Sequence, residues 1–163
     1  MSFNRSKSNN SIRRFAMLNL MGCFVMQTAQ AAVPTQLSLL QAQKLAQAAM
    51  ECAQTKKISI AIAIVNTEGN LILFQRDPAA YVGSIDASIA KAKSSNAFRR
   101  ATSAFTKSLK EGRLELLSLP GVIALEGGIP ILLEGQHLGA IGISGGRSLE
   151  DEECAVTALE KMR

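Results

Sequence analysis

A glycine-rich stretch near the C-terminal end of this 163-residue chain restricts its fold more than any other segment. Residues 139–147 read Gly-Ala-Ile-Gly-Ile-Ser-Gly-Gly-Arg, and their alanine and isoleucine side chains favour a β-strand. Glycines inside a strand indicate that another backbone or a ligand approaches it closely. Ser148 is then expected to cap a helix whose first turn is acidic, over residues 150–153. A strand that leads through glycines to a helix N-terminus can also bind an anion, but these carboxylates favour a tight corner instead.

Hydrophobic periodicity and turn residues divide the rest of the chain into helices and short strands. Ser38 and Gln41 form the pattern of a capping box at the start of the first helix. The pattern predicts helices over 38–57, 84–98, 102–112 and 149–162, and strands over 58–65, 71–75, 122–125, 129–133 and 137–144. Pro130 indicates an edge strand or an interrupted strand start. Tight turns between strands favour an antiparallel sheet, so we expect an α/β fold of the α+β kind, with about five strands in the order α-β-β-α-α-β-β-β-α.

The distribution of charge argues against a nucleic-acid-binding surface. The whole chain has a formal net charge of +5, which alone would suggest an acidic partner. However, four cationic residues lie before residue 32, where there is no Asp or Glu: Arg5, Lys7, Arg13 and Arg14. The remaining residues contain 14 Lys or Arg and 13 Asp or Glu, so the folded part is nearly neutral and has no basic stripe.

The N-terminal segment has the organisation of a secretory signal peptide. Residues 1–14 are polar and basic, and the apolar run from Phe15 to Met26 is too short to span a bilayer. Ala29-Gln30-Ala31 then matches the small-residue pattern of a cleavage site. We therefore expect a signal peptide over 1–31, with cleavage after Ala31.

The remaining residues, 32–163, are expected to form one domain in the periplasm or outside the cell. Two alternatives for export and processing stay open. Arg13-Arg14 hints at twin-arginine export, and Leu20–Cys23 slightly resembles a lipoprotein box, which would place a lipid on Cys23.

Two cysteines would remain after cleavage, Cys52 and Cys154, on the first and last predicted helices. In an oxidising compartment they can form a disulfide if these helices pack side by side. Cys52 also lies on the apolar face of its helix, where a buried free thiol is equally plausible. Neither cysteine has a histidine at metal-ligand spacing, so no zinc site is expected. The consecutive carboxylates at 150–153 point in different directions on a helix, which disfavours a calcium or iron site.

Four short motifs resemble those of one known family. Lys91-Ala92, Phe98, Arg100 and Thr102 match a helix motif K-A-x5-F-x-R-P-T. The other matching segments are Val65–Gly69 for a hairpin V-D-x-x-G, Gly127–Pro130 for a turn G-G-x-P, and Gly139–Gly145 for a strand G-A-I-G-V-S-G. On these motifs, the segment from about residue 37 to 163 is identified as a member of the GlcG/HbpS-like family.

The resemblance implies a profilin-like sandwich of sheet and helices that assembles into homo-oligomers. Some secreted members of the family bind haem and take part in its degradation or in sensing, and related domains are attached to cobalamin-handling enzymes. The implied cofactor is haem or a related tetrapyrrole. Two residues depart from the motifs: Asn66 replaces the acid of the hairpin, and Ala101 replaces the proline before Thr102. Losing that proline removes a fixed φ at a helix start.

Three motif residues are candidates for binding the implied cofactor. A haem-binding relative is expected to use the threonine region at a cleft between subunits, and Thr102 matches it, although helix capping explains this threonine equally well. Lys91 can pair with a haem propionate or remain a solvated lysine on an amphipathic helix. Arg100, like Arg76, can bind a propionate because a guanidinium forks onto carboxylates.

His137 is a fourth candidate, because histidine is the usual protein ligand of haem iron. It is the only histidine, and it lies beside a predicted hairpin turn outside the motifs, where an exposed histidine without a role is the simpler interpretation. Tyr81, the only tyrosine, can ligate iron or stack on a ring, but a loop tyrosine usually does neither.

Three functional hypotheses follow. The first is an exported haem- or tetrapyrrole-binding protein. The second is an enzyme in which the bound iron drives oxidative haem breakdown while the protein holds the ring. The third is a cofactor-free interaction or structural protein that partners a sensor or transporter. A single histidine leaves no Ser/His/Asp set and no Cys–His pair, which disfavours hydrolytic chemistry.

Overall fold

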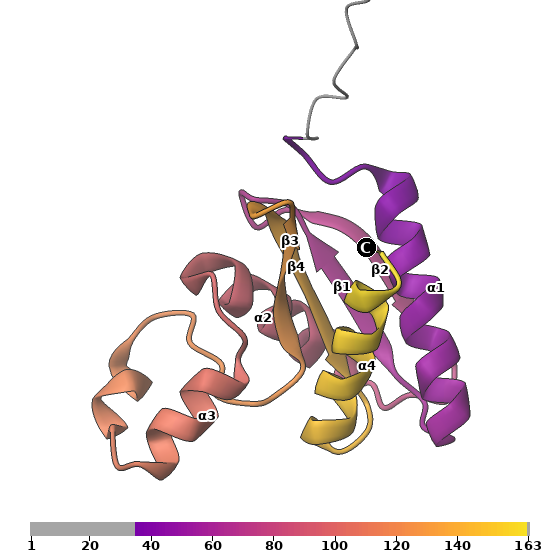
Figure 1. The fold of residues 1–163 in the computed structure, drawn as a ribbon. Helices are drawn as coiled ribbons and strands as arrows, with labels where there is room; N and C mark the ends of the chain where they lie inside the picture. Colours follow the sequence, from indigo (N-terminus) through magenta and orange to yellow (C-terminus); the bar gives the residue numbers. More distant parts are fainter. Residues whose placement is uncertain (1–34, 163) are drawn as a thin grey trace, which may run out of the picture. The chain divides into compact units, whose positions relative to one another are not determined.

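Four α-helices, one 3-10 helix and four strands follow one another along residues 35–162, the part of the chain that the computed structural model describes (Figure 1). The elements are α1 (Leu39–Lys56), β1 (Ala61–Val65), β2 (Leu71–Arg76), α2 (Gly83–Phe98), α3 (Ser103–Lys110), η1 (Leu114–Ser118), β3 (Gly128–Leu133), β4 (Gln136–Ser144) and α4 (Ser148–Glu160). The predicted signal peptide and its cleavage site lie outside the described residues, as do Arg13-Arg14 and Cys23.

The strands form one antiparallel sheet in the order β2-β1-β4-β3. Helices α1 and α4 cover one face of the sheet, and α2 covers the other (Figure 1). Pro130 lies in β3, at the edge of the sheet. An edge strand tolerates proline because it has a neighbour on one side only, so the sheet does not need the backbone N–H that proline lacks. The predicted α+β class with a mainly antiparallel sheet is confirmed.

The prediction of a fifth strand over residues 122–125 is wrong. This segment is an irregular connection in which the backbone N–H of Ile123 donates to Ser94 Oγ on α2 at 3.0 Å. The flanking Gly121 and Gly127 adopt φ values of +80° and +115°, which turn the chain out of an extended path. The sheet therefore has four strands.

β1 is buried along its whole length, and its two sides pack against different neighbours. Ile60, Ile62 and Ile64 belong to the large core under α1 and α4, whereas Ala63 and Val65 form a smaller core with Ala92 of α2. The small side chains allow α2 to approach the sheet closely, as the alternation in the sequence predicts.

A disulfide between Cys52 and Cys154 joins α1 to α4, with Cα atoms 5.4 Å apart. The two helices pack through alanines that lie at one-turn intervals, among them Ala49, Ala53 and Ala158. These small residues bring the helix axes near enough for the bond. At the N-terminus of α1 the capping box is confirmed, since the Gln41 N–H donates to Ser38 Oγ at 3.2 Å.

The glycines in β4 and directly after it mark places where another backbone lies close to the chain. A Cβ on Gly142 would lie 2.1 Å from the carbonyl oxygen of Ser88 on α2. The equivalent atoms on Gly139 and Gly145 would lie 2.0 and 2.2 Å from the carbonyl oxygens of Val65 and Ser59. Of the alternatives that the sequence left open, these three glycines therefore accommodate backbone and not a ligand.

The corner between β4 and α4 is closed by carboxylates of the chain itself. The Gly146 N–H donates to Asp151 Oδ1 at 2.9 Å, and the Arg147 N–H donates to Glu150 Oε2 at 2.8 Å. Arg147 is the N-cap residue, so the predicted capping role of Ser148 is wrong; Ser148 is already the first helical residue. These bonds occupy N–H groups that an anion would need, which supports the tight-corner interpretation.

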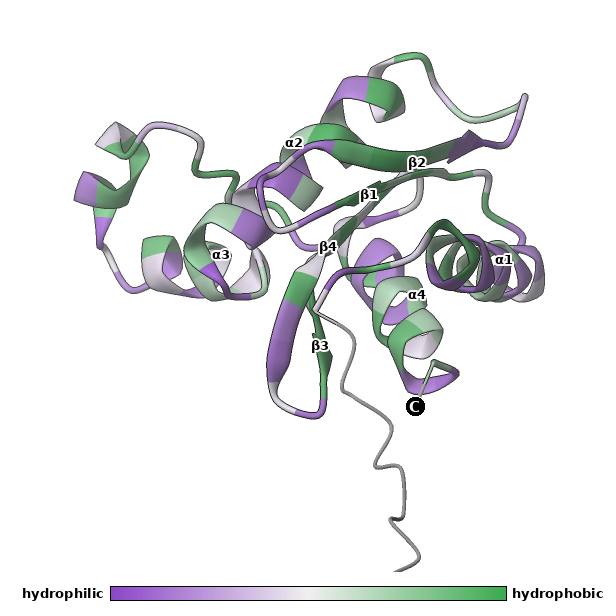
Figure 2. Ribbon diagram, turned by 90° about the horizontal axis from the view of Figure 1, so that it is seen from above, coloured by the Kyte–Doolittle hydropathy of each residue, from purple (hydrophilic) through white to green (hydrophobic). Residues whose placement is uncertain are grey.

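Residues 103–119, which we call the leucine arm, extend from the side of the molecule opposite α1 (Figures 1 and 2). Phe105 is the only fully buried side chain of α3, and η1 has none. Most of the leucine-rich segment after α3 forms the short helix η1. Across residues 35–162, no helix is both long and apolar enough to cross a membrane.

Candidate functional site

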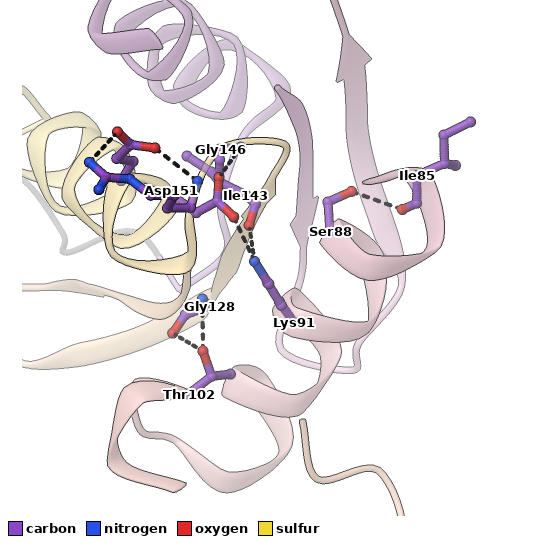
Figure 3. A network of polar contacts seen from close by, with 10 residues as sticks. Ile85, Ser88, Lys91, Thr102, Gly128, Ile143, Gly146 and Asp151 are labelled. Atoms are coloured by element: carbon purple, nitrogen blue, oxygen red, sulfur yellow. Dashed lines mark hydrogen bonds and ion pairs between the residues drawn. The ribbon is translucent and has the colours of Figure 1, made fainter. Parts of the chain in front are cut away.

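The motif residue Lys91 lies inside the protein, between α2 and the start of α4. Its side chain is almost fully buried, and its Nζ donates to Asp151 Oδ2 and to the Ile143 carbonyl, both at 2.8 Å (Figure 3). The interpretation of Lys91 as a solvated helix residue is therefore wrong. A buried ammonium needs such partners because desolvation without them would cost several kcal/mol.

Asp151 is buried as deeply as Lys91. Burial raises the pKa of its carboxyl above the ordinary value, while Lys91 and the Gly146 N–H act in the opposite direction. Desolvation is the largest of these effects, so the ion pair exists against a substantial cost of removing both charges from water. The pair joins α2 and α4, which lie on opposite faces of the sheet, across its end.

Thr102 joins the α2–α3 junction to β3. Its N–H donates to the Gly128 carbonyl at 2.9 Å, and its Oγ1 accepts from the Gly128 N–H at 3.0 Å (Figure 3). It occupies the N-cap position of α3 without a side-chain capping bond, so the capping interpretation is wrong. A Cβ on Gly128 would lie 2.4 Å from the Lys91 carbonyl oxygen and 2.7 Å from Thr102 Cγ2, so both residues pack against the same glycine.

The two arginine candidates lie at separate places. Arg100 is exposed, and its guanidinium lies 5.3 Å from the centroid of the Phe105 ring, in cation–π contact. Arg76 Nη1 donates to the Ala80 carbonyl at 3.3 Å, at the end of β2. Tyr81 is 77% exposed, as expected for a loop tyrosine.

His137 lies in β4, beside the turn to β3 and opposite Leu132. The side chain is half-buried, and Nε2 is shielded from solvent without a hydrogen-bond partner within residues 35–162. Burial lowers the pKa of the imidazole, and the positive charge of Arg99 lowers it further. His137 is therefore neutral at pH 7, which is the form that ligates a metal. The interpretation of an exposed histidine does not hold.

Sequence reasoning missed Arg99, because it occupies the unspecified position between Phe98 and Arg100 in the helix motif. It ends α2 in a left-handed conformation, with φ +49°. This conformation is uncommon for a residue with a side chain and is a signal that only the structure provides. The candidate residues thus fall into a buried group, Lys91 and Thr102 joined through Gly128, and a surface group of Arg99, Arg100 and His137.

A family model described as haem degrading protein HbpS-like matches residues 37–160. The chain belongs to this HbpS-like family. It is 32% identical to the protein GlcG of Escherichia coli K12 over 102 residues, which is 60% of this chain and 72% of GlcG. The family assignment from the sequence motifs is confirmed.

Solved structures of the family have the same fold. A crystal structure of a PduOC–haem complex is 29% identical, with a TM-score of 0.70, covering 77% of this chain and 94% of that one. A double mutant of HbpS from Streptomyces reticuli is 28% identical, with a TM-score of 0.72, covering 81% and 90%.

Proposed function

We propose that this chain is an exported protein that binds haem or a related tetrapyrrole and assembles into a homo-oligomer. The family match over residues 37–160 and the haem complex formed by a structural relative support haem as the ligand. The predicted signal peptide supports export to the periplasm or the outside of the cell.

The observation that favours this function most directly is the unpaired imidazole nitrogen of His137. A neutral histidine with a free Nε2 suits the coordination of haem iron. Because Nε2 is shielded from solvent, the ring must turn outward to reach a ligand at the surface. The guanidinium groups of Arg99 and Arg100 supply charge for two propionates. We therefore assign haem binding to the surface group.

The buried group has a different role in this proposal. Pairing of Lys91 with a propionate would break its contacts with Asp151 and Ile143, which are among the least exposed polar contacts of the fold. We therefore assign Lys91 and Thr102 to holding the α2–α3 junction, from which Arg99 and Arg100 project. Bound haem would supply the redox chemistry for ring degradation, and the protein residues would bind and orient it.

The test is a haemin titration of residues 32–163, followed by the Soret absorbance. We expect a saturable band whose position changes in His137→Ala and whose affinity falls in Arg99→Ala/Arg100→Ala. Arg113→Ala, which removes an exposed arginine of the leucine arm, is the matched control and should bind normally. Absence of a saturable band in the wild type would refute the haem proposal.

Haem degradation is a separate question from binding. The loaded protein is treated with peroxide, and the release of iron is compared with that from free haemin at the same concentration. Faster release from the loaded protein, lost in His137→Ala, supports the enzyme hypothesis. Equal rates would leave a binding protein only.

A further inference from the structure

We propose that Cys52 is a thiol-exchange site, at which an external dithiol opens the disulfide between α1 and α4 and its oxidised form closes it again. The attacking sulfur bonds to Cys52 and not to Cys154. The substrate class is therefore a dithiol and the matching disulfide, and the exchange alters a covalent cross-link of the fold.

The two sulfurs of this cross-link differ in access. Cys154 is fully buried, whereas Cys52 is half-buried and borders a hollow of about 290 Å³ between α1 and the C-terminal part of α4. The other residues that line the hollow are Glu51, Thr55, Lys56, Thr157 and Lys161. A thiolate can attack only a sulfur that it reaches, so exchange in the folded protein begins at Cys52.

Exchange at Cys52 proceeds in two balanced steps. In the first, a thiolate of the dithiol bonds to Cys52 Sγ, the bond to Cys154 breaks, and its electron pair stays on Cys154 Sγ, which takes up a proton. In the second, the other thiolate of the dithiol bonds to the sulfur already linked to Cys52, and Cys52 leaves and is protonated. The dithiol departs as a disulfide after passing two electrons to the protein, and the reverse sequence closes the cross-link.

Other contacts between the two helices do not depend on the disulfide. Lys56 of α1 forms an ion pair with Glu153 of α4, and Lys161 Nζ lies 2.7 Å from Glu51 Oε2. The alanines of both helices also share one buried core, and α1 and α4 lie side by side (Figure 1). These contacts keep the two thiols close after opening, so the cross-link can form again without refolding of the chain. The stability of this face of the sheet then depends on the redox state of its surroundings.

Two single-cysteine variants test the difference in access. Cys154→Ala leaves Cys52 as the free thiol, and Cys52→Ala leaves Cys154, so the pair is matched in lacking the same cross-link. Residues 32–163, which form a compact unit, are used without haem, so the result does not depend on the haem proposal. Each variant is treated with the aromatic disulfide dithiobis(nitrobenzoate), and the released aromatic thiolate is followed by its absorbance.

We expect the Cys52 thiol to react at least about tenfold faster than the Cys154 thiol in buffer. In concentrated urea the two rates should be about equal, because the fold no longer shields either sulfur. Equal rates in buffer, or a faster Cys154, would overturn the proposal.

The wild type provides a second test that does not depend on the folding of a variant. Dithiothreitol is added over a concentration series, and loss of the disulfide is followed by acid quenching and mass spectrometry. Direct attack on Cys52 predicts a rate that is proportional to the dithiothreitol concentration and nearly constant at low urea. If the sulfurs became accessible only by global unfolding, the rate would rise about tenfold for each molar of urea.

The monothiol glutathione identifies the sulfur that is attacked. After a short exposure of the wild type and acid quenching, we expect glutathione on the peptide that contains Cys52. A steep rise of the dithiothreitol rate with urea, or glutathione first on the peptide that contains Cys154, would contradict attack at Cys52.

Discussion

The two faces of the sheet are stabilised in different ways. On one face, isoleucines of β1 and β4 pack under the alanines of α1 and α4, and a disulfide joins the two helices. On the other face, α2 lies directly on backbone at Gly142 and buries serines, an asparagine and Lys91 instead of large apolar side chains. The first face is stabilised by the burial of apolar surface and by a covalent bond. The second is stabilised by close approach and by buried polar groups, most of which are hydrogen-bonded.

The largest effect is expected on the disulfide. Cys52→Ala/Cys154→Ala removes a cross-link between residues 102 apart in sequence, which constrains the unfolded chain. In the chain-entropy view the loss is about 4–5 kcal/mol of unfolding free energy. Urea denaturation measures it, and reduction of the wild type should give a similar loss. Equal stability of the oxidised and reduced wild type would show that the alanine-rich face needs no cross-link.

The buried ion pair should rank next. Asp151→Asn leaves the Lys91 ammonium buried without a counter-charge, at a cost of about 3–5 kcal/mol. In Lys91→Met/Asp151→Asn both charges are absent and an amide oxygen remains for the Gly146 N–H, so the double variant should lose less than the sum of the singles. A double-mutant cycle by urea denaturation measures the coupling. Additive losses would mean that the pair acts as two independent contacts.

Close approach itself is tested with glycine substitutions. Gly142→Ala places a Cβ 2.1 Å from the Ser88 carbonyl oxygen and 2.5 Å from the Ala92 nitrogen, so α2 must move away from the sheet. We expect a loss of roughly 3 kcal/mol. Gly83→Ala, at the start of the same helix, meets no atom within 4 Å and should change stability by less than about 1 kcal/mol. If the two variants melt at the same temperature, the backbone contact does not limit packing.

The smallest effect concerns pH and His137, at the edge hairpin. Its folded-state pKa lies below the ordinary value of 6.5, so its contribution to stability is present above that pH and is lost as pH falls. Between pH 7 and 5, the free energy of unfolding should fall less steeply in His137→Gln than in the wild type. Urea denaturation at several pH values checks this. Parallel pH curves would indicate that the imidazole titrates normally.

Much of the fold followed from local sequence. The capping box at Ser38, the alternation of β1 and the edge position of Pro130 all depend on neighbours within a few residues. The prediction of a strand over 122–125 was wrong, although the apolar residues of this segment match a strand pattern. The backbone N–H of Ile123 donates to the Ser94 side chain on α2 and not to another strand. Strand pairing needs a distant partner, which the segment itself does not specify.

The candidate site could be predicted only as a set of residues. The motifs identified Lys91, Thr102 and Arg100, and histidine chemistry identified His137, but their environments were not predictable. Lys91 has the spacing of an exposed helix residue, yet the glycines of the sheet let its face of α2 be buried. Arg99 was identified only from the structure, by its left-handed backbone conformation and by its charge, which lowers the pKa of His137.

The sequence by itself determined the helices, most strands, the antiparallel class and the family, because periodicity, turns, caps and short motifs act between residues close in the chain. Only the tertiary structure decided that Cys52 meets Cys154, that Lys91 pairs with Asp151, and that Thr102 joins Gly128. Each of these contacts links residues at least 26 positions apart. Such pairing depends on how elements pack in space, and a single sequence does not record that geometry.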